Sequence, residues 1–100
     1  MVRRGSHIEL NHLLGLDKIE GLDQLKELKT LYLQENLIKK MEGFDQLKDL
    51  KILNLTDNMI RTIEGLGNNK DLQTLLLKRN KIGTNGLDDV RGVLEAEAIK

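Results

Sequence analysis

The sequence contains no cysteine, no proline and no tryptophan, and its aromatic residues are one tyrosine and one phenylalanine. Without cysteine the chain cannot form a disulfide framework or a thiolate metal site, and it fits an intracellular compartment better than a secreted one. No stretch approaches the roughly 18 consecutive apolar residues of a membrane-spanning helix. The 16 basic residues balance the 16 acidic ones, so no net charge attracts nucleic acid or an anionic membrane. We therefore expect a soluble protein with neither class of partner.

What the sequence does have is a repeat of 22 residues. The pattern L-x-x-L-x-L-x-x-N-x-I begins at Leu28, at Leu50 and at Leu72. A second block, I/M-E-G-L/F, recurs at the same interval in residues 19–22, 41–44 and 63–66. A fixed period of this length is the signature of a solenoid in which each repeat lays one short strand beside the last.

Each repeat divides into a strand, a glycine turn and an outer arc. Apolar residues two positions apart predict strands at 31–33, 53–55 and 75–77, since alternate side chains share a face. The glycine after each glutamate suits a turn with positive φ. Beyond it, apolar residues at every third position predict a single 3₁₀ or α-helical turn. In the third arc Asn69 takes the middle apolar position, so we expect that turn to be the least tightly packed.

Three asparagines occupy the position where the backbone leaves each predicted strand. An amide carries both a donor and an acceptor, so a stacked row of Asn36, Asn58 and Asn80 can satisfy backbone groups that would otherwise be buried without partners. We therefore expect these asparagines to be structural.

The whole chain reads as one domain, residues 1–100, of class α/β. Residues 1–7 are expected to be flexible or tag-derived, because Arg4-Gly5-Ser6-His7 resembles the remnant of a cleaved purification tag. Ile8, Leu10, Leu13 and Leu16 fit a first strand and turn once the alignment is shifted by one residue. Leu87, Val90, Val93 and Leu94 recur at helical spacing and predict a terminal capping helix. The predicted boundaries are repeats at about 8–27, 28–49, 50–71 and 72–93, with the helix at about 86–98.

These blocks resemble the leucine-rich repeat family, in the 22-residue class typified by a regulatory subunit of protein phosphatase 1. Residues 31–66 are most similar to the repeats of cytoplasmic assembly factors for axonemal dynein arms. Spliceosomal A-prime proteins and an axonemal dynein light chain share much of the same pattern. The resemblance implies a curved solenoid with parallel strands on its concave side, protein binding as its task, and a cytoplasmic, cilium-associated protein that acts in dynein-arm assembly.

Residues between the core leucines should point outward from the concave sheet, in columns that run across the repeats. We take them as the candidate protein-binding residues: Thr30, Ile52 and Thr74; Tyr32, Asn54 and Leu76; Gln34, Thr56 and Lys78; Glu35, Asp57 and Arg79. The shifted alignment extends the columns to His7, Glu9, Asn11 and His12. Tyr32, Ile52 and Leu76 are the expected anchors, because a mixture of apolar and hydrogen-bonding groups is typical of a protein contact surface. Asp57 and Arg79 are expected to pair across neighbouring strands.

No pattern in the chain predicts catalysis, a cofactor or a metal. His7, Glu9 and His12 fall short of a zinc site, since residues 7 and 12 lie on opposite faces of a continuous strand and no fourth ligand is near. Ser6 has no base or orienting acid in view. Two interpretations remain open. The first is a non-enzymatic interaction module, a monomer or weak homodimer, that binds a protein on its concave face. The second is a structural, engineered or truncated solenoid that has no natural ligand and self-associates.

Overall fold

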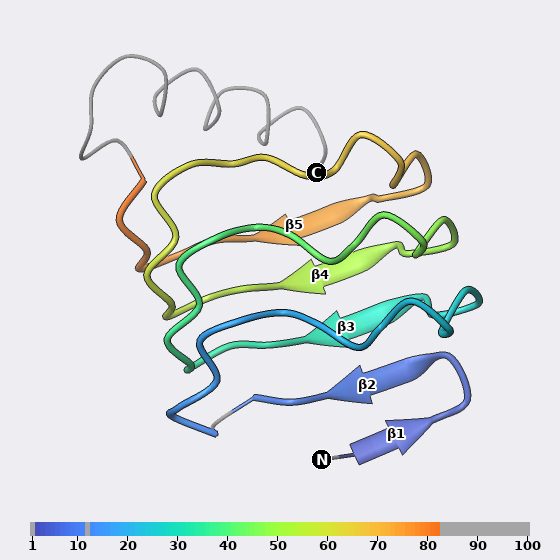
Figure 1. Ribbon diagram of the computed structural model, residues 1–100, viewed down its shortest axis with the longest axis horizontal. Coiled ribbons are helices and arrows are strands. Elements are labelled where there is room, and N and C mark those ends of the chain that lie inside the picture. Colours follow the sequence, from blue (N-terminus) through green and yellow to red (C-terminus); the bar gives the residue numbers. More distant parts are fainter. Residues whose placement is uncertain (1, 12, 83–100) are drawn as a thin grey trace.

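The computed structural model describes residues 2–11 and 13–82, which wind into a coil with a five-stranded sheet along one side (Figure 1). The strands follow one another in the sheet in chain order: β1 (Val2–Arg4), β2 (His7–Glu9), β3 (Thr30–Tyr32), β4 (Ile52–Asn54) and β5 (Thr74–Leu76). Strands β2 to β5 are parallel, whereas β1 is antiparallel to β2. The hairpin of β1 and β2 thus gives residues 2–4 a place in the sheet that the sequence did not predict.

The strand register confirms both the repeat and the shift in its first copy. Leu31 pairs with Leu53, and Leu53 with Leu75, at the 22-residue interval. Ile8 pairs instead with Leu31, so the first coil contains one residue more than the others. Each strand begins one residue before the predicted start, although the ladder continues past its end: the Leu33 N–H donates to the Asn54 carbonyl at 2.8 Å.

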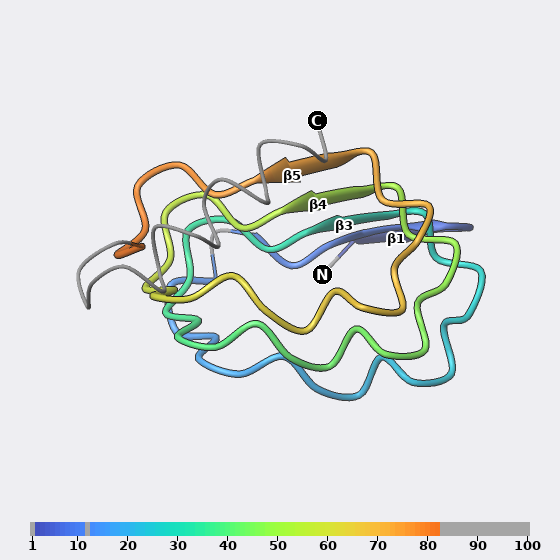
Figure 2. The ribbon, with the colours of Figure 1, turned by 90° about the horizontal axis from the view of Figure 1, so that it is seen from above.

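The outer arc of each coil consists of β-turns and not of the predicted helical turn. The Leu25 N–H donates to the Leu22 carbonyl and the Leu28 N–H to the Leu25 carbonyl, both at 3.0 Å. Successive bonds begin three residues apart and do not overlap, so they close separate turns. Figure 2 shows these arcs as a layer opposite the sheet. The described residues contain no helix, and the predicted capping helix at 86–98 lies outside them.

Leucine side chains from the sheet and the arcs meet in the core between these two layers. Leu31 and Leu53 from the strands are 0% exposed, and so are Phe44 and Leu47 from the second arc. Ile63 and Leu66 in the third coil, and Leu72 and Leu77 in the fourth, are only partly buried. The core is therefore densest around the second coil, where a neighbouring coil covers it on both sides.

The asparagine ladder forms as predicted. The Asn58 amide nitrogen donates to the carbonyls of Leu33 (3.0 Å) and Leu55 (3.1 Å), while its oxygen accepts the N–H of Ile38 at 3.0 Å. Asn36 and Asn80 make the corresponding bonds one coil earlier and one coil later. Each asparagine thereby joins two coils at a place where strand pairing has ended.

Two of the turn glycines are required by close packing as well as by backbone conformation. Gly21, Gly43 and Gly65 all have positive φ, as predicted. A Cβ at Gly65 would lie 2.5 Å from the Met41 carbonyl oxygen, and one at Gly43 would lie 2.7 Å from that of Ile19. At Gly21 the same atom would meet nothing within 4 Å. Successive coils therefore approach each other too closely at the second and third glycine turns to leave room for a side chain.

Candidate functional site

The outer face of the sheet presents the side chains that alternate with the core leucines. In each of β2, β3 and β4 a buried central residue lies between two half-buried ones. The structure places all twelve predicted residues on or beside this face: Thr30, Tyr32, Gln34, Glu35, Ile52, Asn54, Thr56, Asp57 and Thr74 are half-buried, and Leu76, Lys78 and Arg79 are exposed. His7, Glu9 and Asn11 extend it into the first coil and are half-buried, whereas His12 lies outside the described residues.

At the β2 end of this face, three side chains hold one another in place. The His7 and Tyr32 rings meet edge to face, with centroids 4.9 Å apart and planes at 85°. The His7 Nε2 lies 2.9 Å from the Glu9 Oε2, within hydrogen-bond distance. Glu9 is also the register partner of Tyr32. The tyrosine ring is thus braced on one side, which lowers the entropy that a partner would have to remove on binding.

The centre of the face is polar and largely occupied by its own contacts. The Asn54 Oδ1 accepts the Thr56 N–H at 3.1 Å, so this side chain turns back to its own strand. The Gln34 Oε1 is buried and has no hydrogen-bond partner. An unsatisfied buried acceptor is costly.

Asp57 and Arg79 pair across neighbouring coils, as expected. The Arg79 Nε donates to the Asp57 Oδ1 at 2.5 Å and the Arg79 Nη2 to its Oδ2 at 2.9 Å. This bidentate hydrogen bond lowers the pKa of the Asp57 carboxyl, and the same contact raises the pKa of Arg79. Both residues have positive φ (59° and 56°), as does Glu35 at 58°. The three therefore mark the turn at the strand ends, along the edge of the face.

The expected apolar anchors lie on three different strands. Tyr32 and Leu76 flank Asn54 in the register of β3, β4 and β5. Ile52 lies two residues before Asn54 on β4, on the same face and half-buried. Leu76 is the most open of the three, with 43% of its surface exposed. The anchors are thus spread across the face and do not form one compact cluster.

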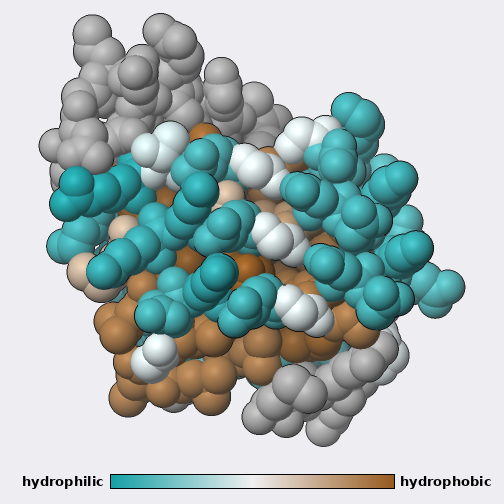
Figure 3. Space-filling view, in the orientation of Figure 1, coloured by the Kyte–Doolittle hydropathy of each residue, from teal (hydrophilic) through white to brown (hydrophobic). Residues whose placement is uncertain are grey.

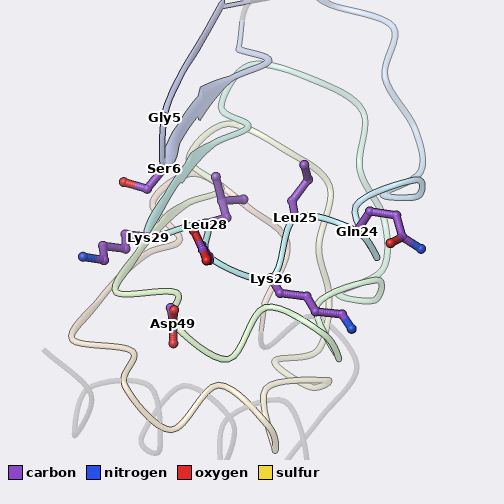
Figure 4. A pocket seen from close by; sticks show the side chains of 9 residues that line it. Gly5, Ser6, Gln24, Leu25, Lys26, Leu28, Lys29 and Asp49 are labelled. Carbon is purple, nitrogen blue, oxygen red and sulfur yellow. The ribbon is translucent and has the colours of Figure 1, made fainter.

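A depression also opens below the hairpin of β1 and β2, at the ends where the strands begin. Figure 4 shows its lining, which includes Ser6, Leu25, Lys29 and Asp49. The Ser6 carbonyl already accepts the N–H groups of Lys29 and Thr30, at 2.8 and 3.0 Å. Throughout residues 2–11 and 13–82, no three His, Cys, Asp or Glu side chains gather as metal ligands would. The same residues include no helix of the length and apolar character needed to cross a bilayer.

Sequence reasoning missed the role of Asn69. The residue is 5% exposed, and its amide nitrogen donates to the Phe44 carbonyl at 3.0 Å and to the Leu47 carbonyl at 2.9 Å. It therefore ties the third arc to the second, in place of the apolar contact that Leu47 makes one coil earlier. A polar residue at an inward position was the signal, because such a group needs buried partners.

A comparison with known families matches the central part of the chain. Residues 26–70 match the model of the leucine-rich repeats, in two copies. No curated protein matches the chain. The match and the parallel sheet together support a leucine-rich repeat protein with the solenoid fold. Leucine-rich repeats are generally non-enzymatic modules that bind other proteins.

Proposed function

We propose that this chain is a protein-interaction module whose partner lies across the outer face of β2 to β5, the concave face of a leucine-rich repeat solenoid. The main support is Leu76, a large apolar side chain that is 43% exposed, whereas the adjacent Leu75, on the core side of the same strand, is 5% exposed. Burial of such a side chain by a partner would contribute up to about 1.5–3 kcal/mol.

The composition of the face fits this role. Interfaces combine apolar or aromatic anchors with a polar rim. Here Tyr32 and Leu76 stand beside amide and hydroxyl groups, and the Asp57–Arg79 pair lies at the edge. The braced Tyr32 ring is the expected centre of the contact, since tyrosine buries a large area at low entropic cost.

The cellular setting is part of the proposal. The similarity of residues 31–66 to the repeats of dynein-arm assembly factors makes a partner from that assembly pathway the first to test, in a cytoplasmic, cilium-associated setting. In a solenoid, stability comes from contacts within a repeat and with its neighbours, and the outer-face side chains contribute little to these contacts. The choice of partner therefore rests on the outer-face residues and not on the repeat itself.

The test is a quantitative pull-down from ciliated-cell lysate with the wild type and the triple variant Tyr32→Ala, Ile52→Ala, Leu76→Ala. We expect a defined set of dynein-assembly proteins to be lost with this variant. The matched control is Lys26→Ala, Lys48→Ala, Lys70→Ala, whose members are exposed on successive arcs at the same spacing. The control should capture the wild-type set.

Circular dichroism and urea titration must first show that both triple variants fold as the wild type does. Capture of identical sets by the two variants would contradict binding on the outer face. A set that contains no dynein-assembly protein, yet depends on the three anchors, would contradict only the cellular assignment. Capture of nothing but further copies of this chain would favour the alternative of a self-associating solenoid.

A further inference from the structure

Three leucines lie exposed together at the corner where the first coil leaves the sheet. Leu13 is 50% exposed, Leu14 71% and Leu37 43%. Backbone hydrogen bonds bring the two segments side by side, from the Leu14 N–H to the Glu35 carbonyl (3.3 Å) and from the Leu37 N–H to the Leu16 carbonyl (2.8 Å). Figure 3 shows apolar surface gathered at lower left, at the end of the molecule that the first coil forms. We name Leu13, Leu14 and Leu37 the leucine corner.

The fold does not require leucine at position 14. Its φ is +61°, a left-handed conformation that disfavours a bulky side chain. The later coils place Glu35, Asp57 and Arg79 in the left-handed conformation at this turn. A leucine there loses backbone energy, and because it stays 71% exposed it gains little burial in return. A strained and exposed apolar residue therefore points to a contact outside the chain.

Basic side chains border the leucine corner along the next stretch of the coil. Lys39 is exposed two residues after Leu37, with buried Ile38 between them, so both face outward. The exposed residues of this border, from successive coils, are Asp17, Lys18, Lys39, Lys40 and Arg61. Four cations and one carboxylate thus adjoin an apolar patch, although the chain as a whole has no net charge. The glutamates Glu20, Glu42 and Glu64 follow a few residues later, so the basic strip is narrow.

We propose that the leucine corner and its basic border form a second protein-binding surface, which takes an acidic amphipathic segment of another protein. Apolar side chains of that segment would cover Leu13, Leu14 and Leu37, and carboxylates directly beside them would meet Lys39 and Lys40. A second copy of this chain fits less well, because an isologous contact would bring two sets of the same lysines together. The surface is separate from Tyr32, Ile52 and Leu76 and does not depend on their function.

The test uses an array of fluorescein-labelled amphipathic peptides of about 15 residues, with leucines at helical and at strand spacing and glutamates beside them. Each has a counterpart with lysine in place of glutamate. We expect at least one acidic peptide to bind the full chain about tenfold more tightly than its lysine counterpart. The affinity of this acidic peptide should fall as the salt concentration is raised. In NMR spectra of the labelled protein, that peptide should shift the amide signals of residues 13–18 and 37–40.

Variants of the chain separate this surface from the outer face. Leu14→Asn suits the left-handed backbone, so it should leave the fold intact and weaken the peptide about tenfold, as should Leu37→Gln. Lys39→Glu with Lys40→Glu should reverse the preference between the two peptides. Leu76→Gln is the matched control, since Leu76 and Leu37 are equally exposed at 43%. It should bind as the wild type does.

Other results would overturn the proposal. One is that no acidic peptide binds better than its lysine counterpart. Another is that the wild type, Leu14→Asn and Leu37→Gln bind the acidic peptide equally tightly. If the protein sediments with phosphatidylserine-containing vesicles and Leu14→Asn abolishes this binding, the leucine corner binds a membrane surface instead. A dimer that Leu14→Asn dissociates in analytical ultracentrifugation would assign it to a second copy.

Discussion

Replacement of Asn58 by alanine tests what holds the coils together beyond the strands. The side chain is 6% exposed and is the hydrogen-bond acceptor for the N–H of Ile38, a residue that is 0% exposed. The two carbonyls it binds keep other donors: Leu33 retains the Asn36 amide at 3.1 Å and Leu55 the Asn80 amide at 2.8 Å. The principal loss is therefore one orphaned buried N–H. We expect Asn58→Ala to lower the free energy of unfolding by about 1–3 kcal/mol.

Urea unfolding followed by circular dichroism measures this loss, and hydrogen exchange locates it. In the variant the Ile38 amide should exchange much faster, while amides of the first coil change little. The Asn58→Asp variant sharpens the test, since a carboxylate keeps the acceptor but faces the Leu33 and Leu55 carbonyls. The carbonyls should raise the pKa of the introduced carboxyl. The variant should therefore be destabilised at neutral pH and regain part of its stability as the pH falls through that pKa.

The control is Asn68→Ala, at an exposed asparagine whose 3.3 Å bond to the Asp45 carbonyl lies at the surface. It should change stability by no more than about 0.5 kcal/mol. Equal stability of the Asn58→Ala and Asn68→Ala proteins would refute the reasoning. So would an Ile38 amide that keeps its protection, because the asparagine would then not be its partner in solution.

Three further predictions address the turns and the outer edge. Gly21→Ala, with open space at the Cβ, should cost only the left-handed backbone penalty of about 1–2 kcal/mol. Gly65→Ala should cost clearly more in the same urea assay, since its Cβ also meets the Met41 carbonyl; equal losses would contradict the close approach of the coils. The lowered pKa of Asp57 means that its bond to Arg79 stabilises the fold above the ordinary value of 3.8 and less as the pH falls below it. The melting temperature of wild type should thus exceed that of Asp57→Asn at about pH 7 and lose that lead at about pH 2, whereas a lead that is independent of pH would rule out the ion pair as its cause. Leu14→Asn should leave the melting temperature unchanged or raise it, because asparagine tolerates positive φ; a marked fall would show that Leu14 packs in the fold.

Most of the fold could be predicted because repeats reinforce one another. A single L-x-L pattern is ambiguous, but its recurrence at Leu31, Leu53 and Leu75 predicts both the strands and their register. The one-residue shift at Ile8 followed from the same alignment, and the register of β2 and β3 confirms it. The asparagine ladder was predictable for a different reason: a polar group at a buried, recurring position must have a recurring partner.

The features that were missed are those that occur once. The strand β1 has no counterpart in later coils, so no repeat pointed to its antiparallel pairing with β2. The three-residue spacing of the arc leucines fits a 3₁₀ turn and a pair of β-turns equally well. A 3₁₀ helix would need overlapping bonds from consecutive N–H groups, and the spacing of the leucines does not distinguish the two. Asn69 depends on carbonyls 22 and 25 residues earlier in the chain.

This division between recurring and single features also separates stability from binding. In a solenoid each coil contacts only its neighbours, so residues that face the next coil must recur if the stacking is to continue. Leucines and asparagines at the recurring positions are buried in the second and third coils and partly buried at Leu72, Leu77 and Asn80. Tyr32, Leu76 and Leu14 break the period and are half-buried or exposed. The stacking of the coils therefore does not determine which residues occupy these positions, and substitutions there should alter binding without unfolding the coil. Residues whose loss lowers stability and residues whose loss lowers binding should form two separate sets.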